Sequence, residues 1–435
     1  MSMLNKLVKF FPHLPIKGLE FLLNAVIYGL VVYLLSSTYY TNKIKLFISL
    51  LMLCYFTYNW RSNKMKKFSI DANLYPLVIL FILFYGFLAS FSYIDLHEIS
   101  KKEIEWIYNR IILITINFTF SIAVFYFITS KTYQQIIDLM FFVAALNGIV
   151  AIAQFVFPDL SRSLSGRMTL LSMEPNHAAL HYMSVFWLVI YNNSSFKLVN
   201  YFARSFVIFG LLVRSKIQLF TILVSASIRS LKMLIFSLFL SVFIFNFSLL
   251  IDNFSVDNEK PEFCEPSTLC DQTYWVSDDL QSFSRFIMGN QKSIEIKPSY
   301  YIRLFSSYYS FKSLNENPLG IGWGSFNTYF QRHSSKSGLQ VNMIGGSGEY
   351  QEIHAGMSES TSKSSLLEIV VATGICAILP LLVLSIYMFR HRRKNKGVFL
   401  TFLSLLVAGM WIETSPFLAL LTVTYVLMRK SVIDE

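Results

Sequence analysis

The chain has 435 residues, of which 54% are hydrophobic and only 14% charged, and its formal net charge is +11. A soluble globular protein carries about 25% charged residues, so this composition excludes a protein whose whole surface faces water and predicts a membrane protein. The basic excess does not predict a nucleic-acid-binding protein, because lysines and arginines gather in short loops between apolar segments, where membrane proteins place them.

Apolar segments that could cross a bilayer as helices recur along the chain, and each span needs about 20 residues. They lie at 20–38, 43–59, 73–92, 106–129, 135–157, 175–191, 198–213, 217–228, 232–251, 364–389, 397–411 and 414–428. We interpret 198–228 as two short helices, because a single span would move the basic loop RHRRKNK to the outer side. The expected fold class is an all-α polytopic membrane protein with about 12 transmembrane helices.

Loop charges give the expected orientation and three regions. The basic loops RSNKMKK, RSLK and RHRRKNK alternate with less basic ones, so we expect both termini in the cytoplasm. An N-terminal transmembrane bundle (about nine spans) covers 1–251, and about three C-terminal spans cover 364–435. Between them, 252–363 is expected to be a large, mostly helical extracytoplasmic loop domain, and its many aromatic residues argue against a disordered linker. Within it, Cys264 and Cys270 could form a small disulfide loop.

Two segments expected on the outer side carry candidate functional groups. The segment SGRMTLLSMEPNHAALHY holds Arg167, Glu174 and His177, with a second histidine one helical turn later. Helix capping and interfacial anchoring are the alternative reading, and no third ligand is near enough in sequence to predict a metal site. In LLVRSKIQLF, the Arg214 guanidinium matches phosphate oxygens in a bidentate fork, although contact with lipid phosphates would also explain it.

Two further segments flank the end of the long loop. In residues 300–330, Arg303 lies on an expected amphipathic helix that ends before Pro318. The glycines at 320, 322 and 324 then predict a tight turn, whose exposed N–H groups could form an anion nest. Residues 354–384 bring His354 towards the tenth span, and place Glu368 in the outer turn of that span, where an ionisable group is costly unless it faces a polar cavity.

These features, in this order, resemble the O-antigen polymerase and ligase superfamily of bacterial inner-membrane enzymes. The matching pieces are Arg167 before EPNHAA, the short basic hairpin, the long outer loop, the passage from Arg303 into ENPLGIGWGSF, and the exit through SSLLEIVVATGI. Ligases of the superfamily typically show a His-Asn pair before the tenth span. This chain has SKSSLLE there instead, which favours a repeat-unit polymerase of the Wzy type.

The resemblance implies glycosyl transfer between undecaprenyl-diphosphate-linked glycans, a donor and an acceptor, without a metal or another cofactor. Arg167, Arg214 and Arg303 would bind the leaving diphosphate, and Glu174, His177 or His354 would act as the general base. We expect Trp275 and Trp323 to stack on sugar rings. Membrane lipid, a chain-length regulator protein and a flippase are the expected partners. A ligase that transfers glycan to lipid A-core, and a flippase or other transporter of lipid-linked saccharide, remain the alternatives.

Overall fold

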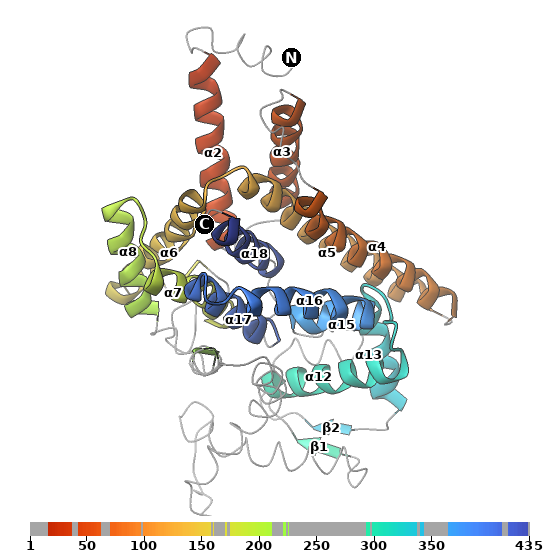
Figure 1. Cartoon of the computed structure of the whole chain (residues 1–435). Coiled ribbons are helices and arrows are strands. Elements are labelled where there is room, and N and C mark those ends of the chain that lie inside the picture. Colours follow the sequence, from red (N-terminus) through yellow and green to blue (C-terminus); the bar gives the residue numbers. More distant parts are fainter. Residues whose placement is uncertain are drawn as a thin grey trace, which may run out of the picture.

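The computed structural model describes residues 16–36, 42–61, 70–96, 99–157, 160, 170–171, 175–210, 221–222, 225, 293–295, 298–336, 340–342, 364–410 and 416–433. Almost all regular structure in these residues is helical, as the all-α prediction requires (Figure 1). The expected spans at 217–228 and 232–251, and most of the 252–363 region, lie outside the described residues.

Seven helices make up the N-terminal part that is described. They are α2 (Ile16–Ser36), α3 (Asn42–Arg61), α4 (Ile70–Leu96), α5 (Lys101–Thr129), α6 (Tyr133–Val156), α7 (Pro175–Tyr191) and α8 (Lys197–Phe209). Side-chain caps fix where two of them begin. Ser100 and Glu103 form a reciprocal capping box at the start of α5, and Thr132 does the same with Gln135 at the start of α6.

Six helices and two short strands follow in the rest of the described chain. They are β1 (Ser293–Glu295), α12 (Pro298–Glu316), α13 (Ser325–Lys336), β2 (Gln340–Asn342), α15 (Ser365–Thr373), α16 (Ile375–Arg390), α17 (Lys396–Gly409) and α18 (Phe417–Ile433). The two strands pair in parallel, with Ile294 opposite Val341. The loop region was expected to be mostly helical, and this strand pair, which encloses α12 and α13 in sequence, was not anticipated.

Three helices of the described part are long and apolar enough to cross a membrane. They comprise Leu74–Leu96, Lys101–Thr129 and Tyr133–Val156. Helices α16 and α17 are apolar but shorter, as are the described parts of α2 and α7. The structure therefore agrees with a membrane protein, whereas the full number of spans and the orientation of the termini stay predictions.

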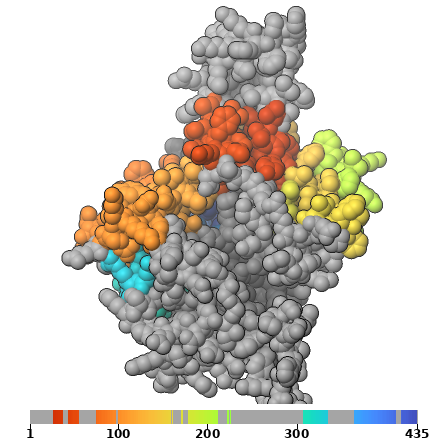
Figure 2. All heavy atoms as spheres, turned by 180° about the vertical axis from the view of Figure 1, so that it is seen from behind, coloured from red at the N-terminus to blue at the C-terminus, as the bar shows by residue number. Residues whose placement is uncertain are grey.

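Helix α5 is central to the packing. It contacts α3, α4 and α18, while α6 packs against α2 and α8, and α17 against α7 (Figure 1). Helix α17 is buried on every side from Gly397 to Gly409, which is the pattern of a helix in the interior of a bundle. Seen from behind, the cyan residues of the α12–α13 region lie against the orange end of α4 (Figure 2).

The segment expected to be one span at 364–389 is two helices. Gly374 adopts a φ of 58°, in the left-handed region, and ends α15 before α16 begins. A broken helix inside a bundle needs partners for the backbone groups that the break frees. Those partners come from the turn between α12 and α13, described next.

Candidate functional site

The glycine-rich turn at 317–324 is packed into the helix bundle. Gly320, Gly322 and Gly324 have φ values of 90°, 85° and 77°, so the predicted tight turn is present. The N–H of Ile321 donates to the Val371 carbonyl (3.0 Å), and the N–H of Gly322 to that of Ala372 (2.9 Å). These bonds satisfy carbonyl groups at the end of α15.

The same bonds correct the prediction of an anion nest at this turn. The N–H of Trp323 donates to the Gly86 carbonyl, and Ile375 at the start of α16 donates back to the carbonyl of Pro318. The N–H groups of Ile321, Gly322 and Trp323 are therefore bonded to carbonyl oxygens of α4 and α15 rather than offered to a ligand, and the N–H of Gly320 is bonded to Asn317. We name this element the docking turn (residues 317–324).

Trp323 lies inside the bundle. It is 1% exposed, its ring meets Phe118 edge to face with 5.5 Å between centroids, and its indole N–H donates to the Leu83 carbonyl (2.9 Å). A Cβ on Gly86 would come within 2.1 Å of Nε1 of Trp323, so the ring lies directly on the α4 backbone. This position makes Trp323 a core residue, and a ring that is 1% exposed leaves no open face for the sugar stacking predicted from the sequence.

A bidentate ion pair joins α5 to α15 close to the docking turn. Nε of Arg110 lies 2.6 Å from Oε1 of Glu368, and Nη2 lies 2.7 Å from Oε2. The two side chains are 13% and 19% exposed, so the pair is largely withdrawn from solvent but still reached by it. Fork-to-fork pairs of this kind are among the strongest hydrogen-bonded pairs in proteins.

Two further pairs of ionisable side chains connect α13 to α5 and to α12. Nε of Arg332 lies 3.7 Å from a Glu103 carboxylate oxygen, and Nε2 of His333 lies 3.5 Å from a carboxylate oxygen of Glu316. We name the group the loop-end cluster; it comprises Glu103, Arg110, Glu316, Tyr329, Arg332, His333 and Glu368.

Tyr329 supports the Glu316 side of the cluster. Its hydroxyl donates to Oε2 of Glu316 at 2.6 Å, and its ring stacks on His333 with 4.0 Å between centroids. Burial, together with the neighbouring carboxylate, raises the pKa of Tyr329 above its ordinary value. The phenol is therefore a stable hydrogen-bond donor that holds the carboxylate in place.

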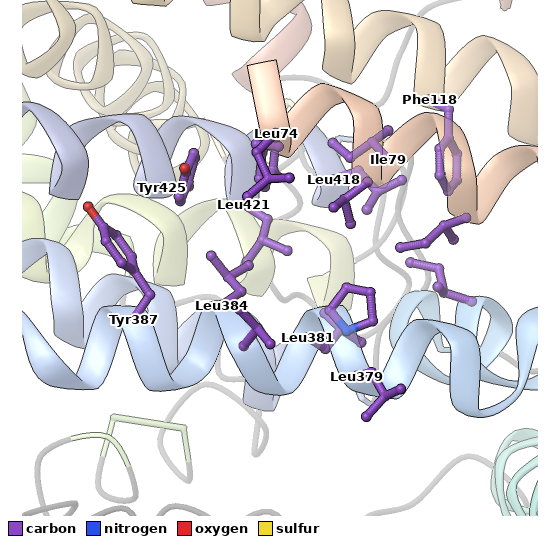
Figure 3. Close-up of a pocket in the computed structure, with 16 residues that line it drawn as sticks. Leu74, Ile79, Phe118, Leu379, Leu381, Leu384, Tyr387, Leu418, Leu421 and Tyr425 are labelled. Carbon is purple, nitrogen blue, oxygen red and sulfur yellow. The ribbon is translucent and has the colours of Figure 1, made fainter. Parts of the chain in front are cut away.

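An apolar groove with a volume of about 430 Å³ runs between α4, α5, α15, α16 and α18. We name it the lateral groove. Tyr387 and Tyr425 stand at one end and Phe118 at the other, with leucines between them (Figure 3). Its lining includes Leu74 and Val383, which are 62% and 66% exposed, so the groove opens sideways out of the bundle.

The residues predicted to act in the reaction fall mainly outside the described part of the chain. Arg303 lies in α12 and His177 in α7, and their side chains are among those outside it. The remaining ones lie outside the described residues altogether: Arg167, Glu174, Arg214, Trp275, His354, Cys264 and Cys270. Among the described residues, no three His, Cys, Asp or Glu side chains are grouped closely enough to hold a metal ion.

Two cations set into apolar helices were missed by the sequence reasoning. Arg110 stands in the expected span at 106–129, and an arginine there calls for an acidic partner such as Glu368. Lys45 of α3 is fully buried; its ammonium donates to Oδ1 of Asn117 on α5 and lies 5.4 Å from the centroid of the Phe120 ring. In both cases a lone basic residue beside a long apolar run was the available signal.

Comparisons of this chain with models of known protein families, with curated proteins and with solved structures give no match.

Proposed function

We propose that this chain is a membrane glycosyltransferase that polymerises undecaprenyl-diphosphate-linked oligosaccharide repeat units into a surface polysaccharide, at the outer face of the bacterial inner membrane. The polysaccharide would be O-antigen, capsule or exopolysaccharide. Both termini would lie in the cytoplasm, and a chain-length regulator and a flippase would be the partners. The proposal rests on the ordered motifs of the sequence together with the lateral groove beside the loop-end cluster.

The groove is the observation that carries the proposal. A lipid-linked sugar has an apolar chain that must stay in hydrocarbon and a charged head that must leave it. The lateral groove is lined by apolar side chains and opens sideways, and its lining residue Ile369 directly follows Glu368 of the ion pair. An apolar groove that opens sideways, on helices that also carry an ion pair, suits an amphiphile of this kind.

The proposed reaction is a displacement at the anomeric carbon of the growing chain. A hydroxyl oxygen of the incoming repeat unit forms the new bond to that carbon, and the bond from the carbon to the diphosphate oxygen breaks. The hydroxyl proton passes to a general base, for which Glu174, His177 and His354 are the candidates. Undecaprenyl diphosphate leaves with the bonding electrons, and cations placed near it lower the energy of that charge, the role proposed for Arg167, Arg214 and Arg303.

A transporter is the main alternative from another class of protein. Broken helices such as α15–α16 occur in transporters, where the break lines a central ion or substrate site. Here the backbone groups at the break are bonded to the docking turn, and the paired charges lie at one end of the bundle. Both features favour a site at one face of the membrane over alternating access.

The test is the lipopolysaccharide gel profile of a strain that lacks this gene, complemented with wild type, Arg303→Ala or Arg390→Ala. Arg390 ends α16 away from the docking turn and serves as the matched control. Loss of the ladder to a single core-plus-one-unit band, rescued by wild type and Arg390→Ala but not by a stably expressed Arg303→Ala, supports the polymerase. Loss of every glycan-bearing band indicates a ligase or flippase, and an unchanged ladder contradicts a role in this glycan.

A further inference from the structure

The Arg110–Glu368 pair has the geometry of a phosphate site occupied by a carboxylate. Two parallel N–H···O bonds of 2.6 and 2.7 Å use Nε and Nη2 of Arg110, the edge of the guanidinium that also matches two phosphate oxygens. An arginine held in this way is already oriented, so an anion that replaces the carboxylate meets a fixed fork.

The depth of Arg110 along α5 places it at the level of lipid head groups. The largely apolar run of that helix is 111–128, broken only by the polar side chains of Thr115, Asn117, Thr119 and Ser121, and Arg110 comes immediately before it. At 1.5 Å per residue the run is about 27 Å long, close to the roughly 30 Å of a hydrocarbon core. The guanidinium therefore lies where hydrocarbon gives way to phosphate.

The lateral groove is lined in part by the two helices that carry the ion pair. Phe118, at one end of the groove, is two helical turns from Arg110 on α5, and Ile369 of its lining follows Glu368 on α15. The groove and the ion pair therefore share α5 and α15, so a lipid that binds in the groove lies against the same two helices that carry the pair.

Glu368 has a second source of stabilisation if it is displaced. It stands in the first turn of α15, whose N-cap is Ser364, and the N-terminal end of a helix favours a carboxylate. Displacement would therefore leave neither a buried bare carboxylate nor a broken helix end, and both side chains are already partly reached by solvent.

We propose that Arg110 binds the diphosphate of a lipid whose chain lies in the lateral groove, and that Glu368 occupies its guanidinium until that diphosphate displaces it. The inference rests on the proposed function for the identity of the lipid and adds a head-group site to the arginines named from the sequence. It predicts that removing the charge of Arg110 weakens binding of the diphosphate, whereas removing the charge of Glu368 strengthens it.

The experiment measures the dissociation constants of undecaprenyl diphosphate and of undecaprenol for the full-length protein in nanodiscs, by native mass spectrometry. Arg110→Gln should weaken diphosphate binding about tenfold or more, and Glu368→Gln should tighten it, because the competing charge is gone. Binding of undecaprenol, which has no phosphate, should stay unchanged in both. Arg332→Gln, which alters another cation of the loop-end cluster, is the matched control and should have little effect.

The outcomes separate this inference from the proposed function. If wild type binds undecaprenyl diphosphate no better than undecaprenol, both fall. A second result is that wild type binds undecaprenyl diphosphate better than undecaprenol while Arg110→Gln and Glu368→Gln weaken that binding equally, or both leave it unchanged. In either case the ion pair has a structural role only, and this inference alone is overturned. Inorganic pyrophosphate, if it binds as tightly as the lipid, would overturn the part assigned to the groove. Arg110→Lys keeps the charge without the fork and replaces Arg110→Gln if that variant does not fold.

Discussion

The docking turn gives the sharpest prediction of the structure, at Gly322. A Cβ at this position would lie 2.1 Å from the backbone nitrogen of Ser90 and 2.3 Å from its Cα. Relaxed contacts between heavy atoms lie at about 3.5–4.0 Å, and the atoms in the way belong to the α4 backbone, which cannot turn aside as a side chain can. We therefore expect Gly322→Ala to lift the turn off α4.

The cost has two parts. Gly322 has a φ of 85°, and a residue with a Cβ in the left-handed region costs about 1–2 kcal/mol. Lifting the turn also withdraws Trp323 from its site, and loss of a buried aromatic side chain costs about 3–5 kcal/mol. The free energy of unfolding should thus fall by about 4 kcal/mol or more.

The measurement is thermal unfolding of the purified protein in detergent, followed by intrinsic fluorescence. A loss of 1 kcal/mol lowers Tm by about 2–4 °C in a domain of 150–250 residues, so the fall for Gly322→Ala should be several degrees at least. Gly29→Ala is the control, because no atom lies within 4 Å of its added Cβ. If the two variants melt alike, the packing of the docking turn on α4 is wrong.

Three other substitutions test separate parts of the structure. Trp323→Phe should lower Tm, yet leave the glycan ladder unchanged at equal protein level, because the ring is buried; an altered ladder would restore its sugar-stacking role. Tyr329→Phe should cost about 1.5–3 kcal/mol at neutral pH, through its bond to Glu316. Because burial raises the pKa of Tyr329 above its ordinary value of about 10, that stabilisation is fully present below about pH 10 and declines as pH rises from there towards the raised pKa. The melting curves of variant and wild type should therefore approach each other in alkali. Leu384→Trp, which fills the groove, should weaken undecaprenol binding, whereas the neighbouring Leu382→Trp should not; equal effects would contradict the groove.

The helices could largely be predicted from sequence, because apolar runs of span length leave few alternatives. The expected spans at 73–92, 106–129 and 135–157 correspond to α4, α5 and α6, whose ends differ from the expectation by a few residues. The break at Gly374 could not be predicted in this way. The residues on both sides are apolar, and the backbone partners of the break come from Pro318 and its neighbours, more than 50 residues earlier.

The docking turn shows the same limit. Three glycines in NPLGIGWGSF predicted a tight turn correctly, since each has a positive φ. The partners of the N–H groups in the turn depend on which helices pack against it. That packing is set by the tertiary structure and cannot be read from the local sequence. Arg110 and Glu368 illustrate this for charges: each stands out beside an apolar run, but their pairing follows only from their depths along α5 and α15.

The docking turn also fixes how α12 and α13 relate to the other helices. Helix α12, which carries Arg303, runs directly into the turn, and the turn is bonded to α15, which carries Glu368. A Cβ on Gly324 would come within 2.9 Å of Ile107, so the turn also lies against α5, which carries Arg110. The backbone of Arg303, about 20 Å before the turn along α12, is thereby tied to that of Arg110 through the docking turn. If both arginines act on one diphosphate, that tie supplies the preorganisation that electrostatic stabilisation of a leaving group requires.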